Sequence, residues 1–229
     1  MKYLALLLIC TTLFASETMV ESDNARYDGN QITLKGHVVV ENDMGRLSAG
    51  SAILLRDTEK STDIDFPWIE LYNDVYFLLL EGRQLKCDKA YLDHTKQQAK
   101  LVGNPLLHYF DGLGEVYANT ALVDYAKVNG KLQATKVTLI GGVQMANSKN
   151  DQYALAEEVE YYPQEELMWL RGHKERVLFY DRKKQVELSA RVVRAQRDVD
   201  KRESVEGVGD VRFLFGAEEL KKLKQGFAW

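Results

Sequence analysis

A short motif recurs five times along this chain of 229 residues. Each copy has an apolar residue, a spacer, a small residue, two mostly polar residues, an Ala or Val, a spacer and usually another apolar residue. The copies lie at 47–54, 85–92, 116–123, 154–161 and 188–195, and their first small residues are 38, 31, 38 and 34 positions apart. Self-similarity at such a period indicates stacked copies of one structural unit. The repeat therefore predicts one extended sheet.

The spacing inside the motif predicts that each of these strands turns a corner. Residues two apart on a strand share a face, so Leu47 and Ala49 lie together. Ala49 and Ala52 differ by three, and a straight strand would put them on opposite faces. The middle pair, Gly50 and Ser51 in this copy, is polar or contains glycine in four of the five copies. Such pairs suit a bulge that twists or bends a sheet.

A second signal, an aliphatic residue two positions before a glycine, follows each motif, and a sixth example at 34–36 opens the domain. Val, Ile, Tyr and Thr are frequent and Pro occurs only at 67, 105 and 163, so little forbids long strand ladders. The early acidic and late basic residues of 217–225 favour a short helix there. Strands are expected near 31–41, 46–55, 75–92, 98–109, 114–126, 131–146, 152–162, 166–180, 185–197 and 204–215. The sequence thus predicts an all-β fold built from repeated strand pairs, with one short C-terminal helix.

Residues 1–15 have the pattern of a secretory signal peptide: Lys2, an apolar run over 3–9, and the small residues Ala15 and Ser16. The run is shorter than the about 20 residues that cross a bilayer, so cleavage is expected, with a retained anchor as the alternative. A single domain over 16–229 is expected, since all-β folds of about 200 residues often form one unit. Cys87 takes the place of the alanine in the other motif copies, which indicates a small buried apolar residue.

The segment 56–74 departs from the repeat. It lengthens the distance from motif anchor to glycine to 33 residues, against 16, 24, 16 and 17 in the other copies. Two interpretations stay open. The segment is either an inserted loop with an aromatic tip around Trp68, acting as a lid or partner contact, or an elongated hairpin.

The sequence offers no convincing catalytic constellation. The four histidines share no spacing typical of metal ligands. Glu157 and Glu158 are of the residue type that hydrolyses glycosides, but they occupy the middle of a motif copy, where a kink with solvent-facing charges explains them. We therefore expect no enzyme, no cofactor and no metal site.

The charge is unevenly distributed. Residues 171–202 hold eleven Lys or Arg against five Asp or Glu, in a chain of net charge −4. Such a stretch attracts phosphates of lipid head groups or nucleic acid, and the alternative is a solvated outer strand face. The export signal and the acidic remainder argue against nucleic acid as a partner.

Residues 25–40, ARYDGNQITLKGHVVV, followed by RLSAGSA at 46–52, resemble the opening of the LptA/OstA family. Members of that family repeat a Gly-Asn-Val-type strand end and an Ala-x-x-Ala-type strand start. The resemblance covers most of 21–215 as a repeat pattern and 25–55 in detail. The chain departs from the family at 56–74 and at His37, where members often carry Asn.

The resemblance implies a periplasmic, twisted, half-open β-jellyroll that holds lipopolysaccharide acyl chains in an apolar groove. It also implies end-to-end contacts with an inner-membrane protein of the LptC type and an outer-membrane protein of the LptD type, and head-to-tail self-association. Unpaired end strands, here 32–40 and a strand near 205–215, are ready templates for such pairing. The alternatives are a structural or adhesive β-solenoid with a packed interior, and an LptC-like component that retains an N-terminal anchor.

An apolar groove shields acyl chains from water at about 0.8 kcal/mol per buried methylene. The residues expected to face it lie at even spacing from a motif anchor or glycine on their own strand. They are Ile32, Leu34, Val38, Val40, Leu47, Ala49, Leu78, Leu80, Leu85, Val116 and Ala118.

Overall fold

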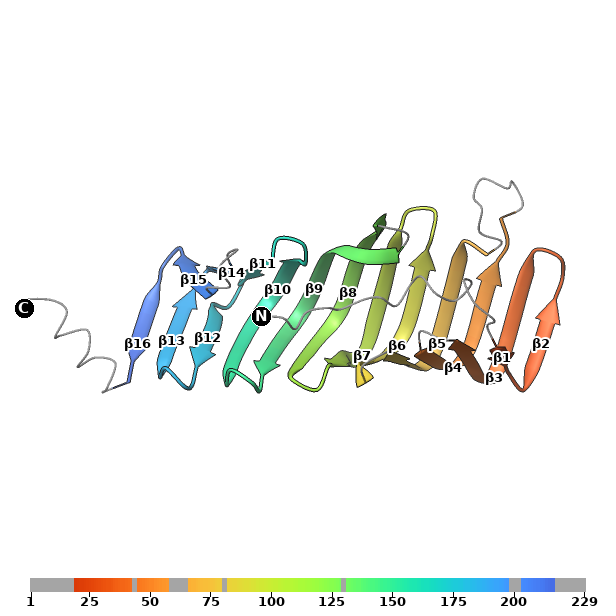
Figure 1. Ribbon diagram of the computed structural model, residues 1–229, viewed down its shortest axis with the longest axis horizontal. Helices are drawn as coiled ribbons and strands as arrows, with labels where there is room; N and C mark the ends of the chain where they lie inside the picture. Colours follow the sequence, from red (N-terminus) through yellow and green to blue (C-terminus); the bar gives the residue numbers. More distant parts are fainter. Residues whose placement is uncertain are drawn as a thin grey trace, which may run out of the picture.

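The computed structural model describes residues 19–42, 45–57, 66–79, 82–128, 131–197 and 203–216. Within these ranges, sixteen strands form one antiparallel sheet, and they lie side by side along the long axis of the molecule (Figure 1). The prediction of an all-β fold made of repeated strand pairs is confirmed. The predicted signal peptide, 1–15, and the predicted helix, 217–225, lie outside the described residues.

The strands are numbered in chain order, and from β3 to β10 this is also their order in the sheet. They are β1 (Met19–Glu21), β2 (Asn24–Tyr27), β3 (Gln31–Asn42), β4 (Gly45–Leu55), β5 (Trp68–Leu79), β6 (Gln84–Asp93), β7 (Gln98–Phe110), β8 (Gly114–Val128), β9 (Lys131–Asn147), β10 (Gln152–Tyr162), β11 (Leu167–Arg171), β12 (Val177–Asp181), β13 (Val186–Ala190), β14 (Val192–Arg197), β15 (Glu203–Val208) and β16 (Arg212–Phe215). The described part of the chain has no helix with the length and hydrophobicity to span a bilayer.

Each long strand bends at a corner, and the corners form a line that divides the sheet into two walls. From β3 to β10, consecutive strands pair along their whole length across this line. Beyond β10 the walls separate, because β12 pairs with the first half of β10 and β11 with its second half. Wall A contains β1, β12, β13, β16 and the halves of the long strands in line with them. Wall B contains β2, β11, β14, β15 and the other halves.

The motif copies are corners of one kind. The strand register shifts at the middle pair, where the sequence predicts a bulge. The shift lies between Ser48 and Ser51 in β4, and between Ala156 and Glu158 in β10. In the fifth copy Arg191 separates β13 from β14. Because the strand bends there, both small anchors of the first copy, Ala49 and Ala52, are buried. The predicted corner is confirmed.

The intervening strands turn their corners with left-handed residues. Gly36 and His37 have φ of 76° and 45°, and Asn73 and Asp74 have φ of 63° and 54°. Asn, Asp and Gly adopt this conformation at the lowest cost. At the corner of β7 the constraint is space, since a Cβ added to Gly103 would lie 2.0 Å from the backbone nitrogen of Leu107.

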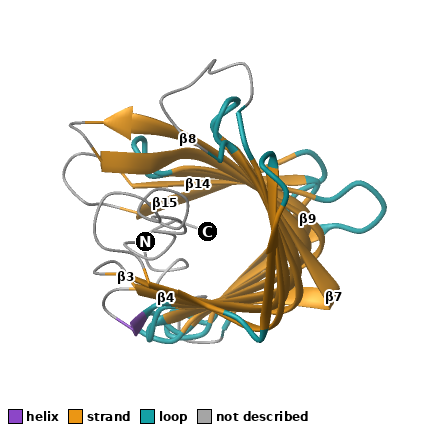
Figure 2. Ribbon diagram, turned by 90° about the vertical axis from the view of Figure 1, so that its right-hand side faces the viewer, coloured by secondary structure: helices purple, strands orange, loops and turns teal. Residues whose placement is uncertain are grey.

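The inward faces carry rows of apolar residues that run along the molecule, across the strands. One row on wall A passes through directly paired residues from β3 to β13: Val40, Leu47, Phe77, Leu85, Tyr109, Val116, Met145, Ala154, Phe179 and Leu188. A row on wall B passes through Ile32, Leu54, Ile69, Leu92, Ala99, Val123, Val137, Tyr161, Met168, Ala195 and Val205. These residues form or flank a single apolar cluster, and the strands curve around it when seen along the long axis (Figure 2).

Two expectations about the N-terminal part are wrong. The strand 32–40 is not an edge, because β1 pairs with 39–41 of β3 and β2 pairs with 32–35. Nor is 75–92 one strand, because β5 and β6 form a hairpin and Gly82 lies in its turn instead of at a corner. Of the segment 56–74, residues 68–74 belong to β5, which pairs with β4 and β6. Residues 58–65 of the segment lie outside the described residues, so the choice between an inserted loop and an elongated hairpin stays a prediction.

Candidate functional site

Nine of the eleven predicted groove residues belong to the interior cluster or pack against it. Leu85 and Ala118, for example, have no exposed surface. The nine are Ile32, Leu34, Val38, Val40, Leu47, Ala49, Leu85, Val116 and Ala118. Their contact with lipid stays a prediction.

Leu78 is not one of the interior residues. It pairs with Arg46 and Gln84, whereas its neighbour Phe77 pairs with the inward-facing Leu47 and Leu85. The prediction counted even positions back from Gly82 as inward-facing. Because Gly82 lies in a turn and not at a corner, this count assigned the inward face of β5 to the wrong set of alternate residues. Leu80, the other residue placed by that count, lies outside the described residues.

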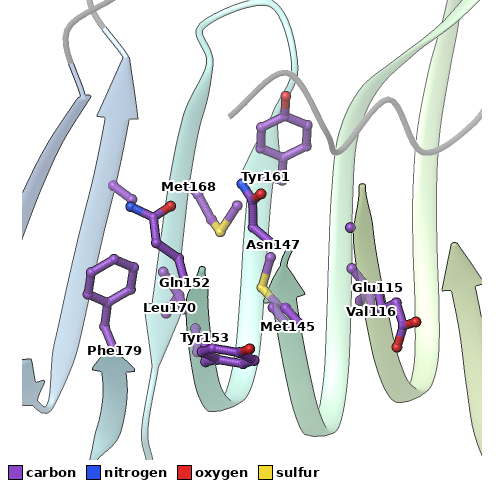
Figure 3. A pocket seen from close by; sticks show the side chains of 14 residues that line it. Glu115, Val116, Met145, Asn147, Gln152, Tyr153, Tyr161, Met168, Leu170 and Phe179 are labelled. Atoms are coloured by element: carbon purple, nitrogen blue, oxygen red, sulfur yellow. The ribbon is translucent and has the colours of Figure 1, made fainter. Parts of the chain in front are cut away.

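A hollow of about 80 Å³ opens in the interior between β8 and β14. Both walls contribute to it: Val116, Met145, Ala154 and Phe179 from wall A, and Tyr161, Met168, Leu170 and Ala195 from wall B. Figure 3 shows the thioethers of Met145 and Met168 near the middle of this group, with Phe179 and Tyr161 toward its ends. Methionine adapts its shape to irregular apolar partners. The arrangement suits a flexible aliphatic chain better than a rigid polar ligand.

The hollow has a polar rim on the side away from the corner line. Gly114, Asn147, Gln152 and Asp181 are paired in order at the end of wall A. Gln152 donates through Nε2 to Oδ2 of Asp181 at 3.0 Å. The rim thus continues an inward row, so polar side chains begin directly where the apolar ones end.

Tyr161 lies near the end of β10 on wall B and also lines the hollow. Burial, with a contribution from the Glu166 carboxylate, raises the pKa of Tyr161 to about 12, and Arg197 acts in the opposite direction. Its hydroxyl therefore stays neutral at physiological pH. It leaves the apolar surface beneath it uncharged.

All eleven predicted site residues lie at or before position 118, and Val116 is the one among them that lines the hollow. The signal for the others was present in the same motif. Ala154 and Tyr161 frame the fourth copy and Ala195 ends the fifth. Continuing the even spacing through these copies finds three further residues of the hollow.

The polar residues singled out in the sequence have structural partners. Glu157 accepts hydrogen bonds from the backbone N–H groups of Glu175 and Lys174 at 2.6 and 2.7 Å, and these donors lower the pKa of its carboxyl group. Glu158 contacts Arg171 at 3.1 Å and His173 at 3.3 Å. These contacts tie β10 to the β11–β12 connection. The described residues contain no group of three or more His, Cys, Asp or Glu side chains that could hold a metal ion.

Cys87 is buried, as predicted, and burial raises the pKa of its thiol to about 12. Its thiol is therefore protonated at neutral pH and a weak nucleophile.

Much of the basic stretch 171–202 forms ion pairs on the strands. Arg171 contacts Glu160 at 2.6 Å, Arg194 contacts Glu206 at 3.7 Å, and Arg176 pairs with Asp210. These arginines are compatible with the outer-face interpretation of the stretch.

Glu160 gives a testable pH dependence. Lys136 first, and then Arg171, hold the pKa of its carboxyl group below the usual value of 4.5, although burial opposes them. A lowered folded-state pKa stabilises the protein above the unfolded pKa, and that stability is lost as the pH falls through the folded pKa. We expect Glu160→Gln to lower the free energy of unfolding by about 2 kcal/mol at pH 7, and the difference from wild type to shrink below about pH 4.5.

Urea unfolding of both proteins at pH 7 and pH 3 measures this difference. Glu206→Gln is the control, because the Glu206 side chain is 63% exposed and exposed pairs contribute little. A difference that is the same at both pH values would contradict the assignment.

No protein-family model and no curated protein sequence matches the chain. Among solved structures, the chain is similar to LptH, the LptA-homologous periplasmic component of the lipopolysaccharide transport device of Pseudomonas aeruginosa. The TM-score is 0.48 at 12% sequence identity, over 59% of this chain and 96% of LptH.

Proposed function

We propose that this protein binds the acyl chains of lipopolysaccharide in its apolar interior and carries them across the periplasm between the inner and outer membranes. The observation that supports this most directly is the hollow between the walls, which is lined by apolar residues of both. The resemblance of residues 25–55 to the LptA/OstA family supports the choice of lipid and compartment. No catalytic step is required of the chain, since an apolar channel with matched ends only has to shield the chains in transit.

The ends of the sheet supply the proposed contacts with LptC-like and LptD-like partners, or with another copy of the chain. At one end β1 and β2 are exposed along their whole length. At the other end β15 and β16 are terminal, and Phe213 and Leu214 are 47% and 62% exposed. Terminal strands present unpaired backbone groups, which favours strand addition.

Site-specific photo-crosslinking tests the proposal. A photoreactive residue at Met168, inside the hollow, is expected to capture lipopolysaccharide in cells, and so is one at Val38 on the interior of β3. Leu178 is the control, because it lies on wall A and is 40% exposed, on the face opposite to its inward-facing neighbour Phe179. Adducts at Met168 and none at Leu178 would support transport through the interior.

The alternative is a structural β-solenoid, in which the same interior residues only pack against each other. The complete burial of Val38, Leu85 and Ala118 is the observation that favours it. A folded protein that gives no lipid adduct at either interior position would overturn the transport proposal in favour of this alternative.

A further inference from the structure

The apolar hollow adjoins a second, charged hollow, and Gln152 lines both of them. The charged hollow lies where the free ends of the two walls approach each other. Its lining includes Lys149, Lys183 and Lys184 from hairpin turns of wall A, and Arg197 with Glu203 from wall B. We call this place the charged mouth.

The two walls contribute differently to the charged mouth. On wall B, Arg197 is held by carboxylates, at 3.5 Å from Glu166 and 2.5 Å from Glu203. Its side chain is only 13% exposed. This cation is therefore already neutralised, and it fixes the position of the β14 end beside Tyr161.

On wall A, Lys183 and Lys184 are more available. The ammonium of Lys183 donates to the backbone carbonyl of Lys149 at 2.5 Å, and no carboxylate of the described residues lies within ion-pair distance of it. Lys184 contacts Asp181 at 3.3 Å, but its side chain is 69% exposed. Asp181 is 6% exposed and keeps the Gln152 amide and the backbone N–H of Lys184 as donors, so the exposed ammonium of Lys184 can turn toward a second anion without leaving the buried carboxylate unpartnered.

This juxtaposition matches one kind of molecule. An apolar cavity next to exposed ammonium groups suits an amphiphile with an anionic group at the point where its acyl chains begin. Phosphate carries up to two charges and accepts several charge-assisted hydrogen bonds, and lysine binds it as a point charge. A neutral head group would gain only ordinary hydrogen bonds from Lys183, without the charge–charge attraction that a phosphate adds.

We propose that the charged mouth binds the phosphate-bearing head group of an amphiphile whose acyl chain lies in the apolar hollow, with Lys183 and Lys184 as the phosphate ligands. This inference rests on the proposed function and adds a head-group site to it. It also predicts polarity, because the acyl chain enters from the mouth while the phosphate stays at the rim.

The test compares two probes that differ only in phosphate: lipid A with both phosphates, and the same lipid A after removal of its phosphates. Each is presented to the full-length protein from the same nonionic micelles, and binding is measured by calorimetry. Lys183→Glu is expected to weaken binding of phosphorylated lipid A about tenfold and to leave the dephosphorylated form unchanged. Lys100→Glu makes the same charge change on the exposed side of β7, far from the mouth, and should change neither.

The outcomes separate the two proposals. Equal loss of both probes in Lys183→Glu, or no loss of either while both bind to the wild type, overturns the head-group site and leaves acyl-chain binding intact. If neither probe binds to the wild-type protein, both proposals are overturned. Inorganic phosphate is the last probe. If the protein binds inorganic phosphate at the charged mouth as tightly as it binds phosphorylated lipid A, the mouth is a free-phosphate site and the lipid assignment is overturned.

Discussion

Tyr109→Ala is expected to lower the free energy of unfolding by about 3–5 kcal/mol, the usual cost of truncating a large buried aromatic side chain. Tyr109 is among the largest side chains with no exposed surface. It lies in the middle of the wall A row, paired with Leu85 on one side and Val116 on the other. Neighbouring strands cannot collapse into the space without shifting the register of the whole row. Urea unfolding followed by circular dichroism measures the loss.

Tyr180→Ala is the matched control, since Tyr180 is 38% exposed on wall A and its truncation should cost less than about 1 kcal/mol. A Tyr109→Ala protein that unfolds at the same urea concentration as this control would contradict a packed interior at that level of the sheet.

Filling the hollow is expected to have the largest effect on binding. Ala195 is 5% exposed and lies between Met168 and Val205 on wall B. Ala195→Phe places a ring in the space that we assign to an acyl chain. We expect the affinity for phosphorylated lipid A to fall at least tenfold, or about 1.4 kcal/mol, in a protein that remains folded. No charge is added, so the loss would report occupancy of the hollow alone.

Ala126→Phe is the control for this variant. Ala126 pairs with the exposed Gln133, on the face of β8 opposite to the buried Tyr125. It should bind lipid A as the wild type does. Unchanged affinity in a folded Ala195→Phe protein would place the acyl chain outside the hollow.

The repeat motif predicted the corners because it carries a contradiction that only a bend resolves. Ala49 and Ala52 are both small and apolar but three apart, and both can face one interior only if the strand bulges between them. The same logic predicted nine of the interior residues. In these cases the sequence of a single strand is enough to predict its corner and its inward-facing residues.

The errors arose where a different residue type performs the same role. Asn73 and Asp74 turn the corner of β5 in the left-handed conformation, as Gly36 does in β3. A prediction based on glycine alone therefore places the corner at Gly82 and assigns Leu78 to the inward face of β5, whereas Leu78 lies on the outward face. Asn and Asp reach this conformation less readily than Gly but more readily than other residues, so the signal in the sequence was weak.

The edges and the hollow depend on long-range pairing. β1 and β2 are short and carry no motif, and only the register of β3 shows that they cover it. The hollow depends on the distance between walls, because Met145 and Met168 come from different walls and meet only in the folded sheet. The charged mouth has the same origin, since Lys183 and Arg197 belong to different walls. The periodicity within one strand does not predict which residues of the two walls lie close together.

The stiffness of the molecule is unequal along its length. From β3 to β10 every strand passes through the corner, so changing the angle between the walls would strain eight continuous strands together. Beyond β10, the strands end at the corner and the walls are joined there by short connections, such as the one between Arg171 and Val177. Bending a few backbone torsions costs far less than distorting a paired ladder. We therefore expect the angle between the walls to change more easily beyond β10 than before it, and such a change would widen or narrow the hollow, which β10, β11, β12 and β14 help to line.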